Sequence, residues 1–200
     1  MFPGVVARTN VNAHGELRRY EPVGTKGHVV ENEHLKVTYV PDIVDAGVSF
    51  VFQNKTDKPV RIVWDETSFI DANGQSERVI HSGVRLMEKG APQPASLIPP
   101  MANLADDMVP ANRVDYSAGG YGYAGGWSYT SLCGTRNTWT ARLEDEACVG
   151  KTFGFFVTYE IDGKKKNVSV RYKYLGKVEQ PKERATATAA PEKKASPAGF

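Results

Sequence analysis

Four histidines are the first residues to consider, because imidazole binds metal ions and transfers protons near neutral pH. They stand at His14, His28, His34 and His81. Two imidazoles bind one metal most directly when they lie two or four residues apart with a carboxylate nearby. No pair of these histidines has either spacing. The sequence therefore predicts no metal site, and we expect no bound cofactor.

Carboxylates form three clusters that could act as acid and base or bind calcium. The clusters are Asp65 with Glu66, Asp106 with Asp107, and Glu144, Asp145 and Glu146. The stretch DETSFIDANG lacks the ligand order of a calcium loop, and charges of this kind are ordinarily solvated. A nucleophile elbow, a phosphate-binding loop and a dinucleotide fingerprint are also absent. We therefore expect a protein that is not an enzyme.

The two cysteines, Cys133 and Cys148, lie fifteen positions apart in a loop-like part of the chain. In an oxidising compartment this arrangement predicts a disulfide. Closing a loop of that size contributes roughly 3 kcal/mol to stability. Two reduced thiols are the alternative, and a cysteine paired in space with a histidine as a nucleophile is a third reading.

An aromatic loop, residues 116–139, is the strongest candidate for a recognition surface, because rigid aromatic side chains bind with little loss of entropy. Its candidate binding residues are Tyr121, Tyr123, Trp127, Tyr129 and Trp139. A sugar, a peptide or a protein could use such a surface. The alternative is that these rings pack onto the domain and cover one end of it.

Composition limits the remaining classes of protein. The chain has 200 residues, of which 40% are hydrophobic and 24% charged, as in ordinary globular domains. No run approaches the roughly 18 apolar residues of a membrane-spanning helix. With 25 basic and 23 acidic residues, we expect no nucleic-acid partner. The first 24 residues lack a secretory signal, so the chain is either cytosolic or has had its signal replaced.

Alternating apolar residues predict several β-strands. The stretches EHLKVTYV, GVSFVFQN and PVRIVWDE alternate clearly, and we expect Pro41 to end the first of them. The turn-forming stretch NKTDK predicts that the second and third form a hairpin. Asn73–Gly74 predicts a tight turn with positive φ at both residues.

The later part of the chain combines a proline-rich stretch with a long hairpin. Residues 90–110 hold five of the twelve prolines, which predicts an extended crossover and excludes a helix or central strand through it. Residues 150–178 alternate on both sides of Asp162–Gly163, which is the clearest hairpin pattern of the chain. We expect Lys164, Lys165 and Lys166 to form a solvated tip of that hairpin.

These patterns predict an all-β, antiparallel, immunoglobulin-like β-sandwich with long loops, seven to nine short strands and one possible helical turn near LEDEACVG. The expected organisation is a polar N-terminal arm over 1–27, the sandwich domain over 28–178 and a disordered tail over 179–200. The tail has almost no large apolar residue, so it cannot offset the entropy cost of folding.

The stretch VSFVFQNKTDKPVRIVWDETSFIDANGQ resembles the opening of small bacterial envelope domains with an immunoglobulin-like fold. In these domains a strand ends in Asn-x-Thr, and a third strand ends in a D-x-N-G turn. SLIPP followed by MVP is similar to their later crossover. The resemblance covers about half of the chain. It implies a lipoprotein-type component whose lipid anchor would lie on an N-terminal segment missing from this sequence.

We therefore hypothesise a non-catalytic binding or assembly module of a bacterial envelope, located in the periplasm or at the outer membrane, with protein partners. The cytoplasm is the alternative location. A second hypothesis is a carbohydrate- or ligand-binding protein, or an enzyme, that uses the aromatic loop 116–139. A third is a structural protein of a virion or appendage, in which the arm and tail reach neighbouring subunits.

Overall fold

The computed structural model describes residues 8–11, 17–42, 47–117, 126–129, 132 and 148–177. These residues form strands and three short 3-10 helices, so the predicted all-β class is confirmed. The strands are β1 (Arg8–Val11), β2 (Leu17–Pro22), β3 (Val29–Glu31), β4 (Leu35–Asp42), β5 (Gly47–Asn54), β6 (Val60–Ile62), β7 (Ser68–Ile70), β8 (Ser76–His81), β9 (Ser96–Ile98), β10 (Asn103–Pro110), β11 (Val114–Ser117), β12 (Gly126–Tyr129), β13 (Thr152–Ile161) and β14 (Lys164–Lys177). The 3-10 helices are η1 (Trp64–Glu66), η2 (Leu86–Glu88) and η3 (Ala111–Arg113).

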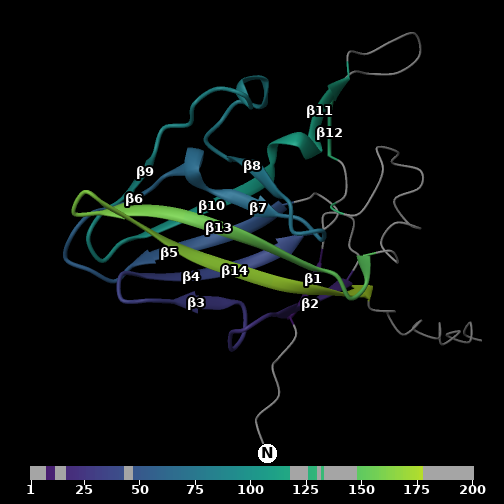
Figure 1. Ribbon diagram of the computed structural model, residues 1–200, viewed down its shortest axis with the longest axis horizontal. Helices are drawn as coiled ribbons and strands as arrows, with labels where there is room; N and C mark the ends of the chain where they lie inside the picture. The colour runs from purple at the N-terminus through teal and green to yellow at the C-terminus, as the bar shows by residue number, and fades with distance from the viewer. Residues whose placement is uncertain are drawn as a thin grey trace, which may run out of the picture.

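One antiparallel sheet folds over on itself to give two layers (Figure 1). Its strand order is β1-β2-β14-β13-β7-β8-β10-β5-β4-β3, with β6 joining β13 to β9. Strand β8 connects the layers, because Ser76 to Arg78 pair with β7 and Val79 to His81 pair with β10. The hairpin β11–β12 is a separate two-stranded ribbon that extends from the upper right of the body in Figure 1.

The alternating apolar residues of both layers meet in a single interior, as predicted from their period of two. Phe50 of β5 contacts Phe155 of β13 with ring centroids 5.3 Å apart, and Tyr39 of β4 lies 6.3 Å from Tyr172 of β14. The predicted core residues are all buried: Val48, Phe50, Phe52, Ile62, Trp64, Phe155, Val157, Val170 and Tyr172. Burial between two layers therefore explains the sequence pattern.

The hairpin β13–β14 agrees with its sequence pattern in detail. Ten residue pairs join the two strands, from Thr152 with Lys173 to Ile161 with Lys164. Asp162 and Gly163 both take positive φ, 52° and 68°, which is the geometry of the favoured two-residue turn. The three consecutive lysines begin β14 directly after this turn, and Lys164 and Lys165 are exposed, as expected for a solvated tip.

Two expectations about strand partners and strand ends are wrong. Strands β5 and β6 form no hairpin with each other: β5 pairs with β4 and β10, whereas β6 pairs with β13 and β9. Turn residues and alternation look the same for a hairpin and for a crossing between layers. Pro41 does not end β4, because it still pairs with Val48 of β5. At this position β3 no longer lies beside β4, so the missing N–H of Pro41 removes no hydrogen bond between strands.

The proline-rich stretch also contains a central strand that we did not expect. Strand β10 pairs with both β5 and β8. The prolines do not prevent this, because four of the five in residues 90–110 precede β10 and the fifth, Pro110, is its last residue. A tight turn joins β7 to β8 as predicted, closed by Gly74 N donating to the Asp71 carbonyl at 3.0 Å, but only Gly74 has positive φ and Asn73 does not. The Asp71 carboxylate also accepts hydrogen bonds from the backbone of Asn73 and Gln75, at 2.8 and 2.7 Å.

The N-terminal residues that are described extend one edge of the sheet, since β2 pairs with β14 and β1 with β2. Residues 178–200, which include the predicted disordered tail, lie outside the described residues, as do residues 143–147 of the possible helical turn. No helix in the described part is long and apolar enough to cross a membrane.

Candidate functional site

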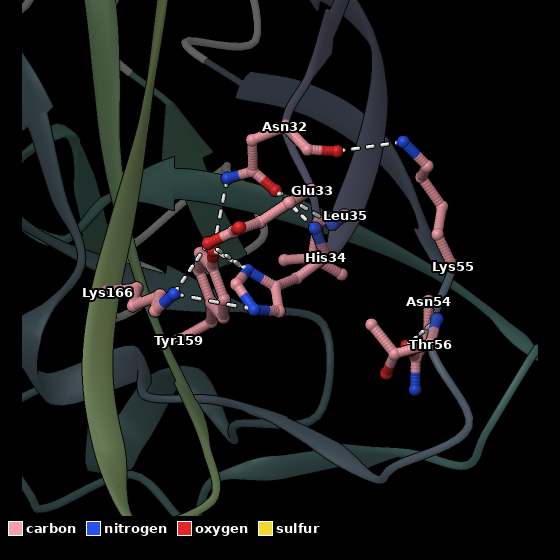
Figure 2. A network of polar contacts seen from close by, with 9 residues as sticks. All are labelled: Asn32, Glu33, His34, Leu35, Asn54, Lys55, Thr56, Tyr159 and Lys166. Carbon is pink, nitrogen blue, oxygen red and sulfur yellow. Dashed lines mark hydrogen bonds and ion pairs between the residues drawn. The ribbon is translucent and has the colours of Figure 1, made fainter.

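A network of polar side chains joins the two layers at their open edge (Figure 2). The turn between β3 and β4 supplies Asn32, Glu33 and His34, and the facing layer supplies Tyr159 of β13 and Lys166 of β14. Asn32 Nδ2 donates to the Tyr159 hydroxyl at 3.0 Å, and His34 Nδ1 lies 3.2 Å from the same oxygen. Lys166 Nζ donates to Glu33 Oε1 at 2.7 Å. We call these five residues the polar seam.

The His34 ring contacts both residues of the facing layer. Its Nδ1 lies 3.2 Å from the Tyr159 hydroxyl, and its Nε2 lies 3.4 Å from Lys166 Nζ, which can only donate. The hydrogen bond from Lys166 lowers the pKa of Glu33, and burial raises the pKa of Tyr159. Tyr159 is therefore a neutral hydroxyl that receives hydrogen bonds. This arrangement joins the two layers.

A second polar group has the composition of a hydrolase triad but different connections. His81 Nδ1 lies 3.0 Å from Asp106 Oδ2, and both side chains are more than nine-tenths buried. Ser82 bonds directly to Asp106 through its N–H and its hydroxyl, whereas a nucleophilic serine would bond to His81. The His81 ring stacks on Trp64, with centroids 4.3 Å apart. The group holds β8 to β10 where the sheet changes layer.

Asn54 at the end of β5 connects two turns of the chain. Its side chain is fully buried, and Nδ2 donates to the carbonyls of Lys58, Ile98 and Pro99 at 2.7, 3.2 and 3.0 Å. Its Oδ1 accepts from the N–H and the hydroxyl of Thr56, at 2.9 and 2.8 Å. The β5–β6 and β9–β10 turns are therefore fixed side by side.

Strand β9 and the β9–β10 turn each expose an apolar side chain. Leu97 of β9 is 58% exposed and Met101 of the turn is 70% exposed. Met101 also has a φ of 57°, a left-handed conformation that favours glycine. Residues 90–105 contain no charged side chain, although 24% of the whole chain is charged. We call Leu97, Met101 and the exposed Pro99 and Pro100 between them the edge surface.

Most of the predicted aromatic site lies outside the described residues, namely Tyr121, Tyr123 and Trp139. Trp127 and Tyr129 lie in β12, where their register partners are Tyr116 and Val114 of β11. Tyr116 is 60% exposed. The aromatic site stays a prediction.

Cys148 is buried, and its predicted partner Cys133 lies outside the described residues, so the disulfide also stays a prediction. The structure records no group of histidine, cysteine, aspartate or glutamate side chains suited to a metal among the residues it describes.

Sequence reasoning missed the polar seam, Asn54 and the edge surface. The seam could not be found, because residues 32–34 are more than a hundred positions away from Tyr159 and Lys166. The edge surface did leave a signal, since residues 90–105 form a long uncharged, proline-rich stretch of the sequence.

Comparison with known proteins adds no family to this description. The sequence matches no protein-family model, and a search of curated proteins gives no significant relative. The edge surface and the two polar groups are therefore interpreted from their own geometry.

Proposed function

We propose that the chain is a non-catalytic binding or assembly module of a bacterial cell envelope, with an immunoglobulin-like domain. The observation that carries the proposal is the edge surface, where Leu97 of β9 and Met101 of the following turn expose apolar side chains. Apolar surface of this kind on a soluble domain marks an interaction site when it is concentrated in one place.

The polar groups support the same function because most of their hydrogen bonds are made within the fold, although the buried Nε2 of His81 has no partner there. Asp106 accepts from His81, from Ser82 and from the N–H of Asp107, which leaves little capacity for a substrate. The polar seam likewise joins two layers. The envelope location is supported by the resemblance of residues 48–75 to envelope domains and by the predicted Cys133–Cys148 bridge.

The test is affinity purification of the tagged chain from cross-linked envelope and cytosolic fractions of its own cells. We expect one protein to copurify with the chain, in constant ratio, from the envelope fraction. Recovery of the chain from the cytosol alone, without any copurifying protein, would contradict the proposal. Turnover of a substrate by the purified chain would contradict its non-catalytic character.

A second candidate function is binding of a carbohydrate through the ribbon β11–β12. It is favoured by the exposure of Tyr116 on a ribbon that extends from the body in Figure 1, since exposed aromatic rings stack on sugars. Binding to a glycan array that Tyr116→Ala abolishes, with the fold retained, would support this function over the first.

A further inference from the structure

We propose that two copies of this chain associate face to face through the outer face of the layer formed by β3, β4, β5 and β10. The pairing register places the residues of this face side by side in three rows that cross the strands. The first row is Glu31, Lys36, Gln53 and Asn103, the second is Val29, Thr38, Val51 and Ala105, and the third is Val40, Ser49 and Asp107. We call these eleven residues the sheet face. It shares no residue with the edge surface, so the inference goes beyond the proposed function.

The centre of the sheet face is apolar and open to solvent. Val51 is 43% exposed and Val40 is 36% exposed, whereas Phe50 and Phe52, on either side of Val51, are buried in the core. Burial alternates along the whole of β5, so Val51 points away from the other layer. Each residue of the second row lies directly opposite its neighbour on the next strand, and none of them is charged. The uncharged centre therefore extends in space across four strands.

Three charged residues lie around this centre, and two of them have no counterion within the chain. Glu31 is bound by Lys55 at 2.6 Å. Lys36 and Asp107 form no ion pair with any residue that the structure describes, although neither side chain is buried. A partner of one sign would be attracted to one of these charges and repelled by the other. A partner that carries one charge of each sign fits both.

The positions of Lys36 and Asp107 make the sheet face complementary to itself. Lys36 lies on the strand to one side of Val51 and pairs with the residue two positions further along β5. Asp107 lies on the strand to the other side and pairs with the residue two positions back. The two charges are therefore at opposite corners, at similar distances from Val51. A two-fold axis in the plane of the contact, at right angles to the line between these corners, places each Lys36 over Asp107 of the partner subunit.

The same two-fold axis brings the apolar residues together. When it passes over Val51, that side chain meets Val51 of the partner subunit, and Val40 lies close to the partner's Val29. The strands of the two copies then cross steeply, which is one of the two ways in which sheets pack face to face. Apolar contacts at the centre and two ion pairs at the margin form in one arrangement.

The outer face of the other layer does not offer this arrangement. There, Glu160 of β13 is the register partner of both Lys165 and Arg61, and Glu21 of β2 is the register partner of Lys173. Opposite charges that are already neighbours within one chain would lose hydration in a contact without gaining new partners. Of the two outer faces, the sheet face is the one suited to a second copy.

The size of the sheet face predicts a weak dimer. A stable protein contact uses roughly 20 to 30 residues on each side, about twice the number in the sheet face. Ion pairs at a solvated margin also contribute little to affinity and more to orientation. We therefore expect a monomer–dimer equilibrium with a dissociation constant on the order of 100 µM.

The test is sedimentation equilibrium of the full chain and of charge-reversed variants over a wide range of concentration. Lys36→Glu and Asp107→Lys should each raise the dissociation constant at least tenfold, because each places like charges opposite one another at both margins. The double variant, Lys36→Glu with Asp107→Lys, restores opposite charges and should return to within threefold of the native constant. Val51→Lys should abolish the dimer. The matched control is Lys164→Glu, an exposed charge at the β13–β14 turn, which should change the constant less than twofold.

The double variant keeps the experiment falsifiable, because damage to the fold by either reversal would persist in it while dimerisation returns. A chain that is still monomeric at about 1 mM would overturn the inference. So would a dimer that tolerates Val51→Lys, or single reversals that weaken the dimer without restoration in the double variant. Copurification of an envelope protein with the Val51→Lys variant tests the proposed function separately, since that partner is expected at the edge surface.

Discussion

Replacing Asn54 with alanine should destabilise the protein more than any other single polar-to-alanine change near the edge surface. The change removes the amide nitrogen, whose two protons are donated to three carbonyls, and the amide oxygen, which accepts two hydrogen bonds. Two donated and two accepted hydrogen bonds, at about 1 kcal/mol each, correspond to a loss of about 4 kcal/mol in the free energy of unfolding. Water can reach the partly exposed carbonyl of Lys58, so we expect a net loss of about 3 kcal/mol.

The assay is urea unfolding followed by tryptophan fluorescence. At a slope of about 2 kcal/mol per molar urea, a loss of this size lowers the midpoint by about 1.5 M with the slope unchanged. The matched control is Gln53→Ala, since Gln53 precedes Asn54 on β5 but is exposed. A loss below about 1 kcal/mol for Asn54→Ala would refute the reasoning, because the contacts would then contribute less than one ordinary hydrogen bond.

Three further predictions concern other parts of the fold. Burial raises the pKa of Tyr39 from 10.0 to about 12. The neutral Tyr39 side chain therefore contributes its full stabilisation below pH 10, and this contribution is lost as the pH rises to about 12. Urea unfolding at increasing pH should show the loss in the native chain and a smaller loss in Tyr39→Phe. In Gly83→Ala the new Cβ would lie 2.6 Å from the His81 imidazole, so the free energy of unfolding should fall by about 1–3 kcal/mol. The control Gly90→Ala, which has open space around the new Cβ, should be as stable as the native chain. A non-reducing peptide map should recover Cys133 linked to Cys148, and two titratable thiols in protein purified under oxidising conditions would contradict that.

The sequence was most informative where one local pattern decides the structure. The β13–β14 hairpin needs only two alternating strands and an Asp162–Gly163 turn, and these are adjacent in the chain. Burial of Phe50, Phe155 and Tyr172 could likewise be predicted, because a period of two places them on one face.

Partners across the layers could not be predicted from such patterns. Alternation in β5 and β6 specifies which side chains are buried but not which strand pairs with which. The change of partner within β8 also depends on the tertiary arrangement, since the residues that pair with β7 and with β10 follow one another without a break. The edge surface required the structure for a different reason: only the φ angle of Met101 distinguishes a strained, exposed turn from an ordinary proline-rich loop.

The central claim is that binding takes place at the edge surface, and amide chemical shifts of the ¹⁵N-labelled chain test it most directly. On titration with the protein that copurifies from the envelope fraction, the account predicts that the largest shifts fall on residues 96–102 and on the neighbouring turn at 55–58. Shifts concentrated on the β11–β12 ribbon or on the polar seam, with residues 96–102 unchanged, would contradict it.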